Sequence, residues 1–239
     1  MLDMLNNKKA FTLIELLVAL AISGVVMAGI YSTYYSQQKS YITQEQVAAM
    51  QQNLRAAMYI MPREIRMAGC DPTGSAGAEI KTANTNSITF TLDITGGESD
   101  GKDNDNDGLV DDDDDDENRF SDGFCDDTNE DVTYSLYTAD GIQKLGRKSP
   151  LTATNQPVAE NIDALDFVYL DANGAPTATI SDIRSVQITL VARTGRRDPG
   201  YTNNTSYINQ QGTPIYTAPN DNFRRKLLTA EVKCRNLGL

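Results

Sequence analysis

The sequence predicts an α+β protein, in which a long N-terminal helix packs on an antiparallel β-sheet that carries an acidic insert. Three observations predict this class: an apolar run over residues 11–30, apolar residues at helical spacing as far as Met61, and apolar–polar alternation beyond Cys70. At 239 residues, the chain has room for one membrane helix and one globular domain. We therefore expect a helical N-terminal part followed by a β-sheet domain at residues 70–239.

The helical part divides into two halves. Residues 11–31 are long and apolar enough to span a bilayer, and residues 32–69 turn amphipathic. A continuous helix of about 50 residues would be roughly 75 Å long. Pro62 predicts a kink or a restart, and Gly69 predicts the end of the helix. The amphipathic half carries an apolar stripe that we expect to pack on the sheet: Ile42, Val47, Met50, Leu54, Met58 and Met61.

The β-sheet domain shows several segments in which apolar and polar residues alternate. They lie at residues 88–94, 132–136, 142–145, 165–169, 186–192 and 228–234. Each segment has one apolar side, which suits an antiparallel sheet covered on one face by the amphipathic half of the helix. Residues 195–222 are rich in Asn, Gln, Thr, Gly and Tyr and lack periodicity, so we predict a long loop there.

The head of the apolar run holds a specific motif. Lys8 and Lys9 precede a run that reads Phe11-Thr12-Leu13-Ile14-Glu15. A charge at bilayer depth is costly, so an ionisable residue such as Glu15 is a functional hypothesis by default. The motif resembles that of the type IV pilin superfamily, whose leader ends just before an FTLIE-like run.

This resemblance implies how the N-terminus is processed. Residues 1–10 would be a leader that prepilin peptidase removes between Ala10 and Phe11, with N-methylation of the new Phe11 amine. Ala10 departs from the family's usual Gly but keeps a small residue at the cut. Glu15 would neutralise the N-terminal amine of a neighbouring subunit, which agrees with the cost of a lone carboxylate in a low dielectric. The alternative is a secretory signal peptide, which would place the mature N-terminus near Gly29.

Several later segments resemble minor pilins of the PilW type, which share features with the J-type pseudopilins of type II secretion. They lie at residues 62–69, 158–162, 184–190 and 224–237. The resemblance implies the pilin fold and a non-enzymatic minor pilin of a type IV pilus, assembled through its N-terminal helix in the initiation or tip complex. The expected partners are prepilin peptidase, the inner-membrane assembly machinery, and other minor and major pilins.

The same resemblance implies two successive locations. Before assembly, the helix lies in the inner membrane and the C-terminal domain in the periplasm, as the basic leader also predicts; afterwards the protein lies in the pilus filament at the cell surface. Two alternative functions stay open: a type II secretion pseudopilin, and a calcium-dependent tip adhesin that would use residues 195–222. Ser32 stands where many major pilins have proline, which disfavours a bulk subunit.

An acidic insert at about residues 100–131 holds most of the charge. The formal net charge of the chain is -12, and residues 100–131 alone contain 16 acidic and 2 basic residues. The front of the insert matches a calcium loop of the EF-hand type, in which alternate carboxylates converge on one ion. The expected ligands are Asp103, Asp105, Asp107, the carbonyl of Leu109, Asp111 and Asp114. Glu117 is the alternative to Asp114, and the remaining acidic run is either a solvated tail or a second site.

Composition narrows the function further. The chain has no His, which removes the commonest catalytic base and transition-metal ligand, so we expect no enzyme. No basic patch outside the leader predicts a nucleic-acid partner. Cys70, Cys125 and Cys234 would lie in an oxidising compartment, which favours one disulfide of unknown pairing and one free thiol over reduced buried thiols. Cys234 falls on the apolar side of the last strand and should be buried or bridged.

Overall fold

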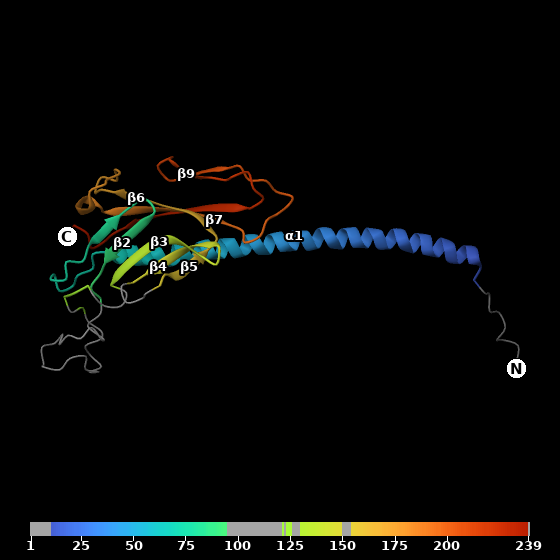
Figure 1. Ribbon diagram of the computed structural model, residues 1–239, viewed down its shortest axis with the longest axis horizontal. Coiled ribbons are helices and arrows are strands. Elements are labelled where there is room, and N and C mark those ends of the chain that lie inside the picture. Colours follow the sequence, from blue (N-terminus) through green and yellow to red (C-terminus); the bar gives the residue numbers. More distant parts are fainter. Residues whose placement is uncertain (1–10, 95–120, 122, 126–129, 150–153, 239) are drawn as a thin grey trace, which may run out of the picture. The chain divides into compact units, whose positions relative to one another are not determined.

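The structure is a computed structural model that describes residues 11–94, 121, 123–125, 130–149 and 154–238. The chain forms two compact units, divided between Glu45 and Gln46. The first unit contains the N-terminal part of one long helix. The second contains the rest of that helix and the strands (Figure 1).

Helix α1 spans Leu13–Met67, which confirms the long N-terminal helix. The predicted restart at Pro62 does not occur, because Pro62 lies inside α1 and is buried there. Proline removes one backbone N–H from the helical ladder. The adjoining turns bury Met61 and Ile65 completely, and this apolar burial offsets the missing hydrogen bond.

The helix ends where the sequence predicts. Gly69 has a φ of +77°, the left-handed conformation that commonly follows a helix. The Cys70 N–H donates to the Met67 carbonyl at 2.9 Å, and the Gly69 N–H donates to the Thr91 carbonyl at 2.9 Å. The second bond crosses to a strand, so the end of the helix is fixed to the sheet.

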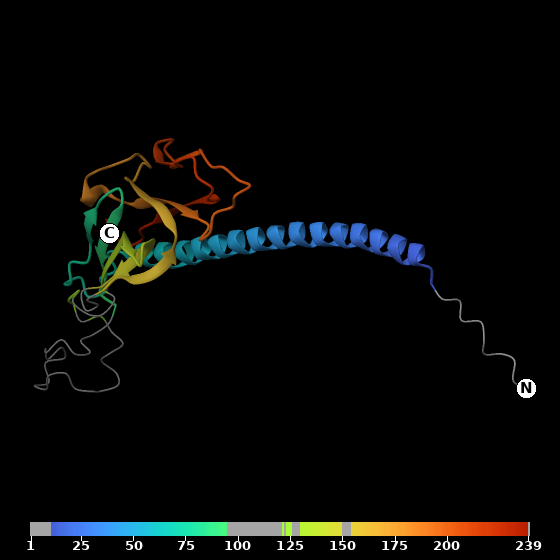
Figure 2. The same ribbon diagram turned by 45° about the vertical axis from the view of Figure 1, so that its right-hand side comes forward.

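The second unit contains separate antiparallel sheets rather than the single sheet that the alternation predicts (Figures 1 and 2). A five-stranded sheet has the order β1-β2-β3-β4-β5, a three-stranded sheet has the order β10-β7-β6, and β8 pairs with β9. The strands span Ile80–Ala83 (β1), Ser87–Thr91 (β2), Asp131–Ala139 (β3), Ile142–Lys148 (β4), Gln156–Glu160 (β5), Ile162–Leu170 (β6), Ser185–Arg193 (β7), Ser206–Ile208 (β8), Pro214–Thr217 (β9) and Arg225–Lys233 (β10), with a short 3-10 helix η2 at Ile180–Asp182.

The two larger sheets separate at Asn161, the single residue between β5 and β6. Its φ of +57° is left-handed, a conformation that Asn tolerates better than most residues. Strand β6 then joins β7 and touches the β1–β2 turn. The Phe167 N–H donates to the Thr85 carbonyl at 2.7 Å, and the Tyr169 hydroxyl donates to the Asn84 carbonyl at 2.8 Å. These bonds hold the two sheets together.

The core lies between the C-terminal part of α1 and the inner faces of the two larger sheets. Most of the predicted stripe takes part: Met50, Leu54 and Met61 are buried, and Val47 and Met58 are partly buried against them. Figure 2 shows this part of α1 running alongside the strands. The strands contribute Ile88, Phe90, Val132, Tyr134, Leu145, Ile162, Phe167, Val186, Ile188, Leu190 and Val232.

Residues 195–222 are more regular than the predicted loop, because they contain the β8–β9 hairpin. Side chains shape this segment. The Asn209 Oδ1 accepts the N–H groups of Gln211 and Thr213 at 3.0 and 2.9 Å. Asn and Asp stabilise turns through such bonds to nearby backbone groups. A hairpin held in this way does not need alternating apolar residues, so the sequence pattern does not reveal it.

Candidate assembly site

The predicted processing and assembly residues lie at the start of α1. Phe11 is 88% exposed, whereas Ala10 lies outside the described residues. The Thr12 N–H and hydroxyl each donate to the Glu15 Oε2 at 2.9 Å, and the Glu15 N–H donates to the Thr12 Oγ1 at 3.3 Å. This reciprocal pattern is a capping box, which satisfies N–H groups that the first turn leaves unpaired.

The role of Thr12 is absent from the predictions above. Glu15 is not a lone carboxylate, and the sequence carries the signal, since Thr12 and Glu15 have the spacing of a capping box at the head of an apolar run. The box holds the carboxylate at the positive end of the helix dipole. Thr12 is therefore the residue that orients Glu15 within a single chain.

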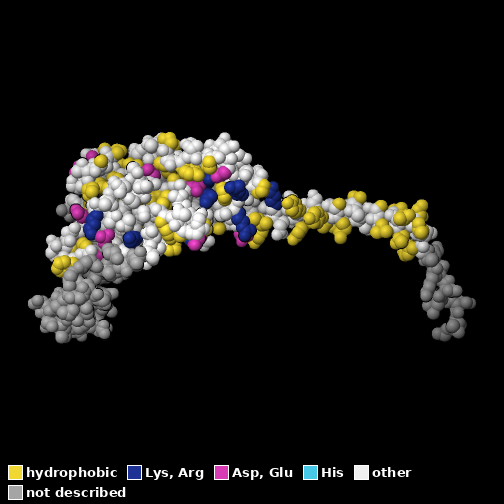
Figure 3. Space-filling view, viewed as in Figure 1, with side chains coloured by type: hydrophobic (Ala, Val, Ile, Leu, Met, Phe, Trp, Pro, Cys, Tyr) yellow, Lys and Arg dark blue, Asp and Glu magenta, His cyan; other side chains and the backbone are white. Residues whose placement is uncertain are grey.

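The first half of α1 exposes an almost wholly apolar surface. Leu13 is 76% exposed and Val25 is 75% exposed. Figure 3 shows hydrophobic side chains along this part of the helix. The apolar part of α1 contains no buried residue, so by length and composition α1 can cross a membrane. Exposed apolar surface of this extent marks a membrane or protein interface.

A polar network ties the end of α1 to the five-stranded sheet. The Arg147 Nε on β4 donates to the Glu64 Oε2 at 2.9 Å, and the Tyr134 hydroxyl on β3 donates to the same oxygen at 2.6 Å. Burial and the nearby Glu64 carboxylate raise the pKa of Tyr134, so its hydroxyl remains a donor. The partners lie 70 and 83 residues from Glu64, too far apart for a sequence pattern to identify.

The acidic insert begins and ends at a hydrogen-bonded neck. The Ile94 N–H donates to the Glu130 Oε1 at 2.7 Å, and the Gly123 N–H donates to the Asp93 Oδ2 at 3.2 Å. Asp93 and Glu130 are both fully buried. The Ile94–Glu130 bond joins the chain just before the insert to the end of the insert, and the Gly123–Asp93 bond fastens a second position within it.

The predicted calcium ligands lie outside the described residues. They are Asp103, Asp105, Asp107, Leu109, Asp111 and Asp114. Within the described ranges, no group of three or more His, Cys, Asp or Glu residues could hold a metal ion. The calcium site stays a prediction.

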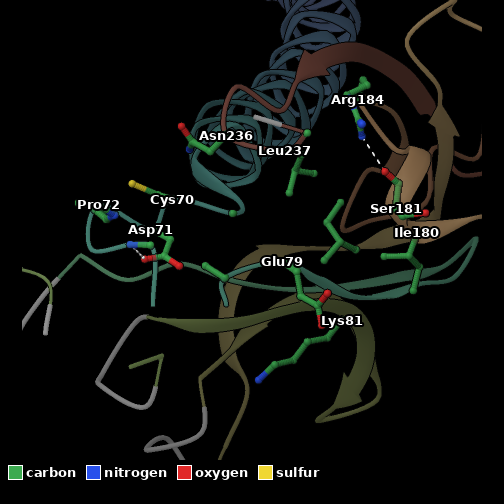
Figure 4. Close-up of a pocket in the computed structure, with 15 residues that line it drawn as sticks. Cys70, Asp71, Pro72, Glu79, Lys81, Ile180, Ser181, Arg184, Asn236 and Leu237 are labelled. Atoms are coloured by element: carbon green, nitrogen blue, oxygen red, sulfur yellow. Dashed lines mark hydrogen bonds between the residues drawn. The ribbon is translucent and has the colours of Figure 1, made fainter. Parts of the chain in front are cut away.

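Cys70 lines a surface pocket of about 920 Å³ beside the end of α1 (Figure 4). Burial and the carboxylates of Asp93 and Asp71 raise the pKa of the Cys70 thiol, so the thiol is protonated at neutral pH and is a weak nucleophile. The close-up shows Arg184 donating to the Ser181 carbonyl, at 2.8 Å. These features do not favour catalysis in this pocket.

All three cysteines are free thiols in the structure. Cys234 is 2% exposed, which confirms its predicted burial, and burial raises the pKa of its thiol to about 11. The Cys125 Sγ lies 3.8 Å from the Ala76 carbonyl, and burial raises the pKa of this thiol also to about 11. The predicted disulfide stays a prediction.

Arg225 clamps the segment at residues 195–222 to the three-stranded sheet. Its side chain is 1% exposed. The Nε donates to the Asp163 Oδ2 at 2.6 Å, and the two terminal nitrogens donate to Asp221 at 2.6 and 2.7 Å. The hydrogen bonds from Arg225 lower the pKa of Asp221. The segment is thus anchored by buried charge pairs with good geometry.

Two tyrosines of this segment, Tyr201 and Tyr216, lie against arginines. The Arg224 guanidinium lies 4.4 Å from the centroid of the Tyr201 ring, and that of Arg225 lies 5.2 Å from the Tyr216 ring. Cation–π contacts of this kind hold both rings in place. Tyr201 and Tyr216 are half-buried, so part of each ring packs within the segment.

Comparison with known proteins assigns the chain to a family. Residues 5–31 match the family described as prokaryotic N-terminal methylation motif. Residues 127–236 match the family described as Type IV Pilus-assembly protein W. This chain is a type IV pilin with a PilW domain. The first match contains the capping box and the exposed apolar helix, and the second contains strands β3 to β10.

One solved structure similar to this pilin is a type IV-like pilin from Thermus thermophilus. The two chains are 14% identical, and the similarity covers 78% of this chain and 97% of the other, with a TM-score of 0.43. At that score, the likeness adds nothing to the assignment. No curated protein matches the chain significantly.

Membership of the PilW family makes this pilin a structural, non-enzymatic component of type IV pilus assembly. Its methylation motif implies prepilin peptidase and the pilus assembly proteins as partners. The same motif, on an apolar N-terminal helix, implies a membrane stage followed by a place in the pilus.

Proposed function

We propose that this PilW pilin is a minor subunit of the complex that initiates the pilus or caps its tip. It inserts in the inner membrane with its C-terminal domain in the periplasm, is cut between Ala10 and Phe11, and is methylated on the Phe11 amine. The observation that carries the proposal is a capped Glu15 at the head of an exposed apolar helix. A carboxylate placed there can pair with the amine of an adjacent subunit, which offsets its desolvation.

The distribution of charge supports a position at the tip rather than along the shaft. Residues 100–131 contain 16 acidic and 2 basic residues. A shaft repeats one subunit many times, so identical acidic inserts would repel along the filament. A subunit present in few copies among other pilins avoids that repulsion.

Variants at the start of α1 test the role of Glu15. We expect Glu15→Gln to reduce the amount of this pilin in sheared pili at least about tenfold, because the amide keeps its shape but cannot neutralise an amine. Thr12→Ala is the comparison variant: it removes the capping hydroxyl but keeps the carboxylate, so it should reduce incorporation less than Glu15→Gln. Equal incorporation of Glu15→Gln and the unmodified protein, measured by immunoblot, would overturn the proposed pairing.

N-terminal sequencing of the mature protein tests the processing step. The proposal expects N-methylated Phe11 as the first residue. A mature chain that starts near Gly29 would instead indicate an ordinary secretory signal peptide.

A deletion strain tests the place in the assembly. We expect fewer pili of normal length, and gold-labelled antibody at filament ends. Label distributed along the shaft would contradict the tip position. Loss of exoprotein release with intact pili would show that the protein serves type II secretion as a pseudopilin.

We also propose that the insert binds calcium through Asp103, Asp105, Asp107, Leu109, Asp111 and Asp114. The support is the spacing of the carboxylates in the sequence, together with the buried neck at Asp93 and Glu130 that fixes both ends of the insert. An ordered insert would give the complex a defined acidic surface.

A further inference from the structure

Four exposed tyrosines lie on α1 within eleven residues of the end of its apolar run. Tyr31, Tyr34, Tyr35 and Tyr41 are 69%, 62%, 64% and 66% exposed. No function assigned above uses these side chains. Tyrosine combines an apolar ring with a polar hydroxyl, so it prefers surfaces that are apolar on one side and wet on the other.

The four side chains share one face of the helix. Tyr34 and Tyr35 lie three and four residues after Tyr31, the spacing of neighbours on a helical surface. Tyr41 lies seven residues after Tyr34, on the same face two turns further along. Gln38 occupies the position between them, so the face is not a continuous apolar seam of the kind that a partner helix would fill.

The length of the apolar run sets the depth of each tyrosine in a membrane. Residues 11–30 rise about 30 Å, which matches the hydrocarbon thickness of a bilayer. The headgroup layer beyond it is about 5 to 8 Å thick on each side. Tyr31, Tyr34 and Tyr35 lie within about 8 Å of the end of the run, whereas Tyr41 lies about 16 Å beyond it.

We infer that Tyr31, Tyr34 and Tyr35 form an aromatic belt that contacts the phospholipid headgroup layer at the periplasmic surface of the membrane. Aromatic side chains anchor membrane helices at this level. The belt sets how far α1 enters the bilayer before assembly, and its contacts must break when the subunit leaves the membrane. The inference rests on the membrane stage of the proposed function, and Tyr41 lies outside the belt.

The chain contains no Trp, so one introduced Trp reports its own depth without background. We propose three single variants of the full chain in phosphatidylethanolamine–phosphatidylglycerol vesicles: Leu20→Trp in the middle of the span, Tyr34→Trp in the belt, and Tyr41→Trp as the matched control. The control shares the residue type and helix face of Tyr34 and differs only in depth. Tyr34→Leu, measured by trypsin protection, checks that insertion survives.

We expect Leu20→Trp to be quenched by lipids brominated deep in the acyl chain. Tyr34→Trp should be quenched by lipids brominated close to the headgroup. Tyr41→Trp should be quenched by aqueous iodide at least about threefold more strongly than Tyr34→Trp, because it lies beyond the headgroup layer.

Each other outcome overturns the inference. Equal iodide quenching at positions 34 and 41 would mean that the helix has no belt. Loss of lipid quenching at position 34 alone, with position 20 still quenched, would mean that another protein covers the tyrosine face. Absence of lipid quenching at position 20 would overturn the membrane stage itself, and the belt with it.

Discussion

At the scale of single residues, removing Arg147 would leave the Glu64 carboxylate without its cationic partner. The Arg147 Nε lies 2.9 Å from the Glu64 Oε2, and the Arg147 side chain is 10% exposed. Removing one partner of such a pair leaves an uncompensated charge. We expect Arg147→Met to lower the free energy of unfolding by roughly 2 to 4 kcal/mol, measured by urea denaturation of the domain.

Lys144→Met is the control for Arg147→Met. Lys144 lies on the same strand and pairs with Glu160, whose side chain is 47% exposed and can be solvated when the lysine is removed. Its effect should be much smaller. If the two substitutions cost the same, the network around Glu64 does not fasten α1 to the sheet.

Gly69 is constrained in two ways, by its left-handed backbone and by the nearby Leu237 side chain. Comparison with Gly174 separates the two effects. The φ of Gly69 is +77°, and a Cβ would lie 2.5 Å from the Leu237 Cδ2. Gly174 has a φ of +78° but has no atom within 4 Å of its built Cβ. Gly174→Ala should therefore cost about 1 kcal/mol from backbone strain alone. Gly69→Ala should cost more than Gly174→Ala, since Leu237 must also move.

Thermal denaturation of both glycine variants checks this difference. An equal loss for the two variants would show that Leu237 yields freely. The contact between the helix terminus and the chain's last residues would then not help to hold α1 in place.

At the scale of whole elements, the sequence predicts the helix and the strands whose formation depends on the burial of apolar side chains. Strands β7 and β10 contain the predicted segments, and their apolar residues join the core. Strand β7 is buried on both faces, polar Gln187 and Thr189 included, because it is the central strand of its sheet. Strand β5 escapes prediction, since it is five residues long and contains Pro157. Strands β8 and β9 escape it because side-chain hydrogen bonds and the Arg225 clamp order them.

The site residues also divide into those that a local sequence motif identifies and those that depend on contacts between distant segments. A local motif identifies Phe11 and Glu15, and the Thr12 cap was equally visible in the sequence. The partnership of Glu64 with Arg147 depends on the register of two distant strands and could not be predicted. Pro62 shows tertiary packing prevailing over local preference, because its helix continues to Met67.

Because the Arg225 clamp depends on the charged Asp221 carboxylate, we expect its contribution to stability to be lost in acid. The hydrogen bond from Arg225 lowers the folded-state pKa of Asp221. A carboxyl group with a lowered folded pKa adds stability that is present above its unfolded pKa, about 3.9, and is lost as pH falls through the folded pKa. We expect Asp221→Asn to destabilise the domain at pH 7 and to have a progressively smaller effect toward pH 2.

Urea denaturation across this pH range measures the effect. Asp182→Asn, at an exposed carboxylate on η2, is the control and should change little at any pH. A destabilisation by Asp221→Asn that is the same at pH 7 and pH 2 would mean that the charge of Asp221 contributes nothing to the clamp.

At the scale of the whole molecule, the calcium binding that we propose for the acidic insert would couple an ion to the stability of the domain. The ends of the insert are rooted at Glu130 and Asp93, inside the folded unit, so ordering the insert should stabilise the sheet at the neck. With a dissociation constant of roughly 10⁻⁴ to 10⁻³ M, 10 mM calcium would contribute about 1.4 to 2.7 kcal/mol. For a domain of this size, the melting temperature should rise by about 3 to 10 °C and fall again with chelator.

Two double variants distinguish a calcium site from general screening of negative charge. Asp103→Asn with Asp105→Asn removes two predicted ligands, whereas Asp115→Asn with Asp116→Asn removes the same charge from the neighbouring acidic run. If the loop binds calcium specifically, only the first variant should lose the calcium-dependent rise in melting temperature, because ligand geometry decides affinity. If both variants lose it equally, calcium acts on the insert as a counterion, and the ordered acidic surface proposed for the assembly does not form.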